Sequence, residues 1–440
     1  MTRKIEESKK EGRNEMNTFA LKGTIVTSKT KDELLIQEHG YVICEHGMSK
    51  GIFKTLPKEY EQIEVRDMGE RLIIPGLIDL HVHAPQYAFR GMGMDMELLD
   101  WLNTYTFPEE AKYSDLSYAK KAYERFVHAL QKGATTRACI FGTLHVPATL
   151  LLMDQLEESG LLCYVGKVNM NRNSIESLCE ESVEQSLRDT RSWLETCKKR
   201  YQYTKPILTP RFIPSCTDEL LYGLADIQKE MRIPAQSHLS ENRSEIEWVK
   251  ELCQDAKSYG EAYDHRGLFG SYGKTIMAHG VHSDWEERKL MKDRGVFLAH
   301  CPQSNTNLSS GIAPIRAYLE EGNYIGLGTD VAGGHDLSLF QTMAESIQVS
   351  KLRYCLMEEK QKPLTIEEAF YLGTKGGGAF FGQVGSLEEG YEFDAVVLDD
   401  SNLSDLQELN VRNRLERIIY LSDERNIYEK YAFGRKISLE

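Results

Sequence analysis

Short apolar runs alternate with longer amphipathic segments through most of the chain, and this alternation is its dominant pattern. The runs are too short for helices and rich in aliphatic side chains, which predicts buried strands. Eight such strands are expected, at Leu77–His83, Thr135–Phe141, Leu161–Val168, Pro206–Phe212, Ala235–Leu239, Lys274–His279, Val296–His300 and Tyr324–Thr329.

The segments between these strands follow the 3.6-residue period of amphipathic helices. The clearest apolar stripe is formed by Leu116, Ala119, Tyr123, Phe126, Val127 and Leu130. Eight strand–helix units predict a TIM-type (β/α)₈ barrel over residues 75–383. An open doubly wound sheet is the alternative. No Gly-x-Gly-x-x-Gly motif opens a helix after the first strand, so a dinucleotide site is not expected.

Both ends of the chain show a β pattern, and neither end is long enough for a large core of its own. Strands are expected at Phe19–Val26, Tyr41–Cys44, Asp394–Leu398 and Arg417–Leu421. We therefore expect residues 17–74 and 384–440 to pair into one small β-sandwich domain that flanks the barrel. Residues 1–16 are charged and lack an apolar segment, which predicts a disordered leader and argues against a secretory signal.

Composition and charge narrow the class of protein. The 440 residues are 41% hydrophobic and 27% charged, which is typical of a soluble globular protein. The net charge of −14 disfavours binding to nucleic acid or to an anionic membrane. No apolar stretch approaches the roughly 18 residues of a spanning helix. The nine cysteines are odd in number and include no Cys-x-x-Cys, so we expect reduced thiols and a cytoplasmic location.

Candidate chemistry begins at the first strand of the barrel, which ends in His81 and His83. Alternate residues of a strand share a face, so the two side chains point the same way, about 6–7 Å apart along the strand. One metal ion can bridge that gap through two imidazole nitrogens. The His-x-His pair alone is weak evidence, and the prediction depends on the strands that follow.

Polar residues also end four later strands, at the edge where barrel enzymes carry their chemistry. They are Arg211 and Phe212 on the fourth strand, His238 and Glu241 on the fifth, His279 on the sixth and Asp330 on the eighth. Each alone has an ordinary interpretation, such as a helix cap for Asp330 or a salt bridge for Arg211. His282 and His300 are more readily structural. Buried polar groups are costly unless paired, so their convergence favours a functional site.

Three histidines and an aspartate form the donor set of a mononuclear Zn²⁺ site that keeps a position for water. The expected ligands are His81, His83, His238 and Asp330. The same donors are compatible with Fe²⁺. Glu241 is placed to relay protons from the water to the substrate and the leaving group. His279 is a candidate either to hydrogen-bond the activated water or to act as a further ligand.

The motifs that carry these residues resemble those of the amidohydrolase superfamily: the segment 75–83, the histidine that ends the fifth strand, His279 and Gly-Thr-Asp at 328–330. Longer motifs are similar to those of its guanine deaminase branch. They are His-Ala-Pro-Gln-Tyr-Ala-Phe at 83–89, Leu-Asp-Trp-Leu-Asn-Thr-Tyr-Thr-Phe-Pro-Glu-Glu at 99–110, Pro-Arg-Phe at 210–212, Ser-His-Leu-Ser-Glu-Asn at 237–242, His-Cys-Pro-Gln-Ser-Asn at 300–305 and Gly-Thr-Asp-Val-Ala-Gly-Gly at 328–334.

This resemblance implies hydrolytic deamination of guanine to xanthine and ammonia, with one Zn²⁺ per subunit of a homodimer. It implies that Glu241 protonates the ring nitrogen beside C2 and passes a proton to the departing amine. Asp330 would accept a proton from the attacking water. The implied substrate-binding positions are His83, Gln86, Arg211, Phe212, His238, Glu241 and Asp330.

Two variants of zinc chemistry are not expected. The fourth strand ends in Arg211 and not in a bridging lysine, which argues against a binuclear site. The His-x-Glu and Pro-Cys-x-x-Cys signature of the nucleic-acid deaminases is absent. Two alternative functions stay open: a mononuclear amidohydrolase that deaminates a related purine, pterin or triazine, and an inactive scaffold of the same fold.

The connection from Ala84 to Pro108 is long for a strand–helix loop. It carries Gly91 and Gly93 among three methionines, at positions 92, 94 and 96. A mobile cover over the substrate and a packed contact between subunits are equally compatible with this composition.

Overall fold

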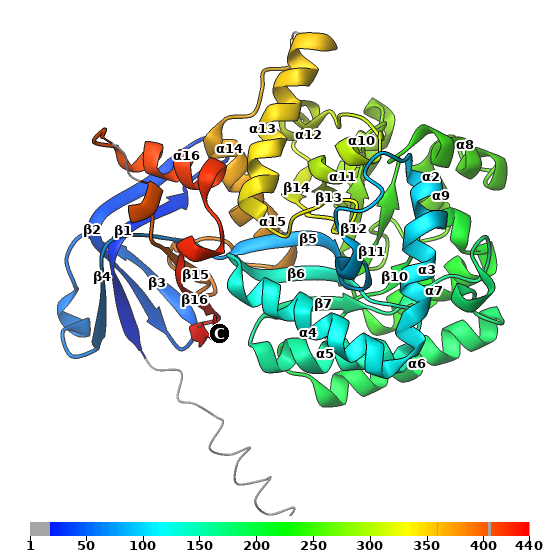
Figure 1. Ribbon diagram of the computed structural model, residues 1–440, viewed down its shortest axis with the longest axis horizontal. Helices are drawn as coiled ribbons and strands as arrows, with labels where there is room; N and C mark the ends of the chain where they lie inside the picture. Colours follow the sequence, from blue (N-terminus) through cyan, green and yellow to red (C-terminus); the bar gives the residue numbers. More distant parts are fainter. Residues whose placement is uncertain (1–17, 359, 404–405, 440) are drawn as a thin grey trace, which may run out of the picture.

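The middle of the chain forms a closed barrel of parallel strands that is surrounded by helices (Figure 1). The computed structural model describes residues 18–439, except 359 and 404–405, so the predicted leader at 1–16 lies outside the described residues. The strand order is β11-β12-β13-β14-β5-β6-β7-β9, and a parallel bridge between Leu208 and Ala235 joins the two ends of this sheet. The predicted (β/α)₈ architecture is confirmed.

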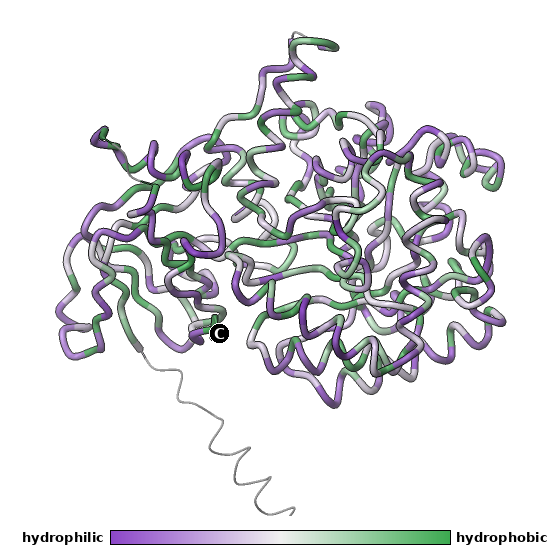
Figure 2. Tube along the Cα trace, in the orientation of Figure 1, coloured by the Kyte–Doolittle hydropathy of each residue, from purple (hydrophilic) through white to green (hydrophobic). Residues whose placement is uncertain are grey.

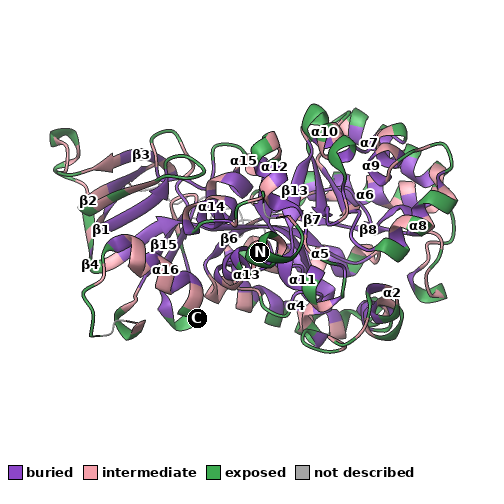
Figure 3. Cartoon of the chain, turned by 90° about the horizontal axis from the view of Figure 1, so that it is seen from above, coloured by how far each residue is buried: buried purple, intermediate pink, exposed green. Residues whose placement is uncertain are grey.

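The strands of the barrel region follow the predicted positions closely. They are β5 (Leu77–His83), β6 (Thr135–Phe141), β7 (Leu162–Gly166), β8 (Val168–Asn169), β9 (Lys205–Pro206), β10 (Thr209–Pro210), β11 (Ala235–Leu239), β12 (Thr275–His279), β13 (Phe297–His300) and β14 (Tyr324–Leu327). Every residue of β5, β6, β12 and β13 is buried, as expected for strands covered on both faces (Figure 3).

Two predicted strands are each divided into two short pieces. The third becomes β7 and β8, and the fourth becomes β9 and β10; β8 pairs with β10 in a separate two-stranded sheet. Pro206 and Pro210 lack the N–H that a continuous ladder needs. Arg211 and Phe212 therefore lie beyond the strand, at the mouth of the barrel.

Helices surround the barrel, and the first of them lies over its mouth. They are α2 (Leu98–Trp101), α3 (Phe107–Ala111), α4 (Leu116–Lys132), α5 (Val146–Ser159), α6 (Val183–Arg200), α7 (Asp218–Met231), α8 (Arg243–Leu252), α9 (Tyr259–His265), α10 (Trp285–Arg294), α11 (Pro302–Asn307), α12 (Ile315–Glu321), α13 (Leu339–Leu356), α14 (Ile366–Tyr371) and α15 (Gly377–Phe381). Within the described part of the chain, none of them is both long and apolar enough to cross a bilayer.

Helix α4 shows how the sequence sets these elements. Asp115 caps its N-terminus by accepting from the backbone N–H of Ser117 at 2.8 Å. The predicted apolar stripe is buried from Ala119 to Leu130, whereas Leu116, in the first turn, is 48% exposed. Figure 2 shows that hydrophobic and hydrophilic stretches alternate along the helices around the barrel, as expected for amphipathic helices.

Strands from both ends of the chain share one seven-stranded sheet, in the order β17-β16-β15-β4-β1-β2-β3. Its strands are β1 (Phe19–Ser28), β2 (Leu34–Glu45), β3 (Met48–Phe53), β4 (Glu64–Pro75), β15 (Ala395–Leu398), β16 (Ile427–Ala432) and β17 (Arg435–Ile437). One face encloses a core of its own, and the other packs on the remainder of the protein. The described strands form a single sheet, so the predicted sandwich is not confirmed.

The predicted strand Arg417–Leu421 is wrong. These residues belong to helix α16 (Val411–Leu421), which Asn410 caps by accepting from the backbone N–H of Asn413 at 2.9 Å. The helical spacing of Val411, Leu415 and Ile418 buries one face against the sheet. The apolar run at its end is too short to distinguish a strand from the last turns of a helix.

Lys430 on β16 joins the seven-stranded sheet to the barrel. Its side chain is fully buried, and Nζ donates to the carbonyl oxygens of Leu130, Gly133 and Thr135 at 2.8, 2.7 and 3.0 Å. These carbonyls lie at the end of α4 and the start of β6. The ammonium thus satisfies acceptors that the helix terminus leaves open.

Replacing Lys430 with methionine should lower the free energy of unfolding by about 2–4 kcal/mol, because buried carbonyls lose their donor. Urea denaturation followed by fluorescence measures the effect. Lys436→Met on the adjacent strand β17 is the matched control, since Lys436 is exposed and makes only a surface ion pair with Glu429. Equal stability of the two variants would contradict a role for Lys430 in holding the sheet to the barrel.

Candidate active site

Asp79 fixes the geometry where the first and last strands of the barrel meet. Its carboxylate accepts from the backbone N–H groups of His81 and Thr329, both at 3.1 Å, and from the Thr329 hydroxyl at 2.6 Å. The backbone N–H of Asp330 in turn donates to the carbonyl of His81 at 2.8 Å. These bonds bring two segments about 250 residues apart into one fixed arrangement.

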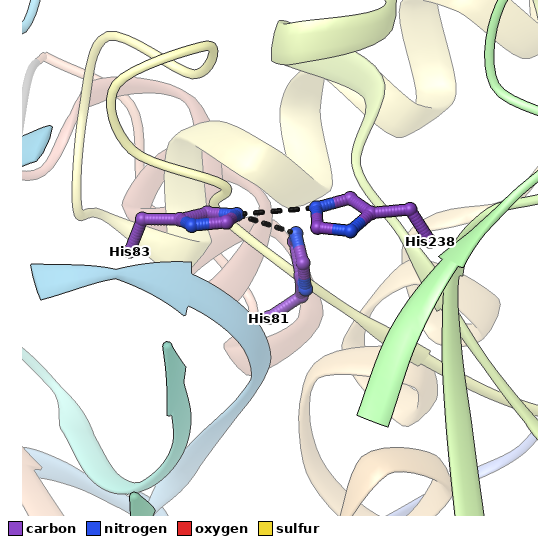
Figure 4. Close-up of side chains that lie close together, drawn as sticks. All are labelled: His81, His83 and His238. Atoms are coloured by element: carbon purple, nitrogen blue, oxygen red, sulfur yellow. Dashed lines mark hydrogen bonds between the residues drawn. The ribbon is translucent and has the colours of Figure 1, made fainter. Parts of the chain in front are cut away.

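Three imidazoles converge at the mouth of the barrel, as Figure 4 shows. Nε2 of His83 lies 3.2 Å from Nε2 of His81 and 3.3 Å from Nε2 of His238. Oδ1 of Asp330 lies 3.1 and 3.3 Å from Nε2 of His81 and His83. The donor atoms of His81, His83 and His238 lie within 4.8 Å of one another, as do those of His81, His279 and Asp330. The structure brings the four predicted ligands together.

The protonation of these groups suits a cation between them. Nδ1 of His238 lies 2.6 Å from the carbonyl oxygen of Arg211, to which it donates, so the lone pair of Nε2 faces the cluster. Burial lowers the pKa of His83 to about 4 and that of His238 well below its usual range. Burial alone would raise the pKa of Asp330, but the nearby His81, His83 and His279 hold it well below its usual range. Neutral imidazoles and a carboxylate are therefore the resting forms.

Two residues of the site adopt a left-handed backbone. Asp330 has φ of 46° and His279 has φ of 80°, which non-glycine residues rarely adopt. His279 places its Nε2 at 3.4 Å from Oε2 of Glu241 and 3.7 Å from Oδ2 of Asp330. Its Nδ1 lies 2.9 Å from Oδ1 of Asn305. Strain of this kind is typical of functional sites, where the surrounding structure holds it.

Glu241 follows β11 and is buried beside the ligand cluster. The Ser310 hydroxyl donates to its Oε1 at 3.4 Å. Burial, followed by the nearby charge of Asp330, raises the pKa of Glu241 well above its usual range. Behind it, Glu245 accepts from the backbone N–H of Glu241 at 3.2 Å and from the Tyr259 hydroxyl at 2.8 Å. Glu241 is thus a carboxyl held in place in surroundings that favour its protonated form.

A pocket with about 420 Å³ of empty space lies in front of this cluster. Leu98, Trp101, Leu102, Phe212 and Leu308 form its apolar walls. Its polar lining consists of His83, Gln86, Arg211, His238, Glu241, Glu245, His279 and Asp330. Every predicted substrate-binding residue therefore lines one pocket, and a planar heterocycle would lie between apolar walls with a few fixed polar groups, as is typical of ligand sites.

Gln86 and Arg211 both bind the carboxylate of Glu110, a residue to which the sequence alone gives no role. Nε2 of Gln86 donates to Oε1 of Glu110 at 2.9 Å, and Arg211 forms an ion pair with Oε2 of the same carboxylate. Oε1 of Gln86 accepts from the backbone N–H of Ala332 at 3.2 Å. Glu110 ends the quoted motif at 99–110, but nothing in its spacing indicates which residues it contacts.

Two histidines at the strand ends lie outside the pocket lining. His300 is buried, burial lowers its pKa to about 3, and neither ring nitrogen has a hydrogen-bond partner among the described residues. His282 places Nε2 at 2.8 Å from the carbonyl oxygen of Ser310. The structural interpretation of both is consistent with these positions. Ser310, which contacts Glu241, carried no recognisable signal in the sequence.

The connection from 84 to 108 lies over the pocket. Leu98, Trp101 and Leu102 reach into it, and Nε1 of Trp101 donates to the carbonyl of Met92 at 3.1 Å. At the rim, the Ser244 hydroxyl donates to Glu97 at 3.2 Å. The segment therefore covers the site, and its mobility stays a prediction.

Known proteins resemble this chain in sequence and in structure. A family model described as "Amidohydrolase family" matches residues 72–432. The guanine deaminase of Rattus norvegicus is 38% identical over 427 residues, which cover 92% of each chain. That of Dictyostelium discoideum is 40% identical over 385 residues, or 86% of this chain and 85% of the relative.

A solved structure resembles the chain over nearly its whole length. It is a guanine deaminase from C. acetobutylicum with guanine bound in its active site. It is 46% identical to this chain, superposes with a TM-score of 0.93, and covers 96% of this chain and 100% of its own.

Proposed function

The chain belongs to the amidohydrolase family, and from this we propose that it is a zinc-dependent guanine deaminase. It removes the 2-amino group of guanine hydrolytically and releases xanthine and ammonia. The observation that carries the proposal is the pocket itself. Three candidate metal ligands, His83, His238 and Asp330, line it beside Glu241, and His81 contacts His83 and Asp330 without lining the pocket; the other polar groups of the lining suit a purine.

The donor set fits one divalent metal ion. His81, His83, His238 and Asp330 present neutral nitrogen atoms and one anionic oxygen toward a common point, which matches the preference of Zn²⁺. The bond from His238 to the Arg211 carbonyl supplies the outer support that metal-bound histidines usually have. When bound, the ion supplies a Lewis acid that lowers the pKa of a water molecule to about 7. Zn²⁺ is favoured over Fe²⁺, although both accept these donors.

Recognition of guanine rests on complementary hydrogen bonds. Guanine offers O6 as an acceptor and ring N–H groups as donors. Arg211 supplies N–H donors, and Gln86 supplies both kinds of group. Phe212 packs against the purine face. Adenine lacks O6 and would leave buried donors unpaired, and such sites can discriminate by about 10⁴–10⁵-fold.

The carboxyl groups of Glu241 and Asp330 transfer the protons. Glu241 holds a proton in the resting state and donates it to the ring nitrogen beside C2. Asp330 accepts a proton from the attacking water as its oxygen bonds to C2. Glu241 then removes the remaining proton from the oxygen on C2 and delivers it to the amine. The C–N bond breaks, ammonia leaves, and Asp330 returns its proton to Glu241. His279, at 3.4 Å from Glu241 and 3.7 Å from Asp330, is placed between the two carboxyl groups and can hydrogen-bond the water.

The same proposal includes a cytoplasmic homodimer that binds neither nucleic acid nor membrane. A second candidate, deamination of a related purine, pterin or triazine, uses the same ligand cluster. Adenine and aminotriazines lack an acceptor equivalent to O6 for Arg211 and Gln86, whereas a pterin keeps one, so the substrate comparison below includes a pterin. An inactive scaffold would be expected to lack a ligand or Glu241, and all are present.

The purified, zinc-loaded protein should convert guanine to xanthine with release of one ammonia per xanthine. Ultraviolet spectroscopy follows xanthine, and an enzymatic assay follows ammonia. Adenine, a pterin and an aminotriazine are the comparison substrates, and elemental analysis of the protein as purified should find one zinc per chain. Turnover of one of these compounds without turnover of guanine would reject the assignment.

A further inference from the structure

Glu110 lies behind the purine pocket and contacts two residues that line it. It is 3% exposed and belongs to α3, the short helix that follows the cover segment. One carboxylate oxygen accepts from Gln86 and the other from Arg211. Glu110 itself does not line the pocket.

The bonding pattern requires two acceptors at this position. A carboxylate has only acceptors, whereas a side-chain amide has one acceptor oxygen and one donor nitrogen. Gln86 donates through Nε2 and accepts the Ala332 N–H through Oε1, so its amide orientation is fixed at both ends. The second N–H of Nε2 is left for a ligand. Without Glu110, only the bond from the Ala332 N–H would orient the Gln86 amide.

Arg211 is held in the same way. Its charge is almost completely buried, and the carboxylate of Glu110 compensates it. The ring of Phe107, on the same helix as Glu110, lies 5.2 Å from the guanidinium carbon. A guanidinium has five N–H donors, so Arg211 can bind Glu110 and still donate to a ligand. The Arg211 carbonyl also supports His238, which connects this residue to the ligand cluster.

We propose that Glu110 is the positioning residue that determines selectivity for a 6-oxopurine. It holds the guanidinium of Arg211 and the amide nitrogen of Gln86 as donors toward the purine edge. This inference rests on the proposed function. Glu110 and Phe107 belong to α3, which begins within the connection 84–108 that covers the pocket. Packing of this connection over the pocket and orientation of the two donors therefore occur together.

The test is Glu110→Gln, which preserves shape and removes one acceptor. The new amide can accept from Arg211 or from Gln86 but not from both, and the other partner then faces a donor. The affinity of the zinc-loaded protein for hypoxanthine, which keeps O6, should fall at least about tenfold, the loss of one charge-assisted hydrogen bond. The affinity for unsubstituted purine, which lacks O6, should change by less than about threefold. Calorimetry measures both.

Kinetics with guanine provide a second measurement. KM should rise about tenfold or more while kcat changes far less, because Glu241 and the ligand cluster are untouched. The matched control is Glu109→Gln. Glu109 is adjacent and also buried, but its carboxylate binds Lys112 and Tyr118, which do not line the pocket. That variant should keep the wild-type affinities and KM.

A merely structural role would lower the affinity for both ligands alike and leave their ratio unchanged, and this result would overturn the proposal. If the glutamine variant does not fold, Glu110→Asp is used in the same test, since it keeps the charge and withdraws it from both partners. If that variant keeps the wild-type ratio of the affinities for hypoxanthine and unsubstituted purine, the proposal is rejected as well. Failure of the wild-type protein to form xanthine would instead reject the proposed function, so the two failures are distinct.

Discussion

Replacing Glu241 with glutamine should lower kcat for guanine by about 10²–10⁴-fold, the range expected for loss of a general acid–base group. The glutamine amide keeps the shape and can still accept from Ser310, but it has no acidic proton to give to the ring or to the amine. The metal content should be unchanged, because Glu241 is not among the four ligands. Steady-state kinetics together with elemental analysis measure both properties.

The matched control for this change is Glu247→Gln on the next turn of α8. Glu247 is exposed and pairs only with Lys250, so this variant should retain wild-type kcat. A Glu241→Gln protein with near-normal turnover would refute the proton-transfer role. A variant that has lost its metal would instead show that Glu241 supports the metal site.

Removing the metal by dialysis against a chelator should lower turnover by at least about 10³-fold, because several kcal/mol of transition-state stabilisation are lost. Adding one equivalent of Zn²⁺ should restore it, and parallel additions of Fe²⁺ under anaerobic conditions compare the two metals. Asp330→Asn should bind zinc more weakly than the wild type, since it removes the anionic donor that lies 3.1 and 3.3 Å from two of the imidazoles.

Asp336→Asn controls for this substitution. Asp336 lies in the same loop, is exposed, and accepts from the backbone N–H of Ser338 at 2.7 Å. It should keep both metal and activity. Full turnover by the metal-free wild-type protein, or unchanged zinc affinity in Asp330→Asn, would contradict the proposed metal centre.

The barrel and the ligand cluster were predictable because both follow from local rules. Period-two alternation places His81 and His83 on one face of β5, and parallel strands bring all of their carboxyl ends to one edge. His238 and His279 lie at the ends of β11 and β12, and Asp330 follows β14, so barrel closure brings them to the same edge. The strand predicted at 417–421 is wrong because its apolar run is ambiguous by itself. The signals that indicate a helix, the cap at Asn410 and the spacing from Val411, precede this run.

The amino-acid sequence by itself determined the strand–helix alternation, the residues at the strand ends and hence the donor set of the proposed metal centre. Only the tertiary structure decided which buried carboxylate faces which cation. Glu110 and Arg211 are 101 residues apart and meet because the cover segment packs across the barrel mouth. Ser310 and Glu241 are brought together likewise across 69 residues. Such contacts depend on packing between distant segments, whereas the periodicity of a strand or helix is set by its own backbone.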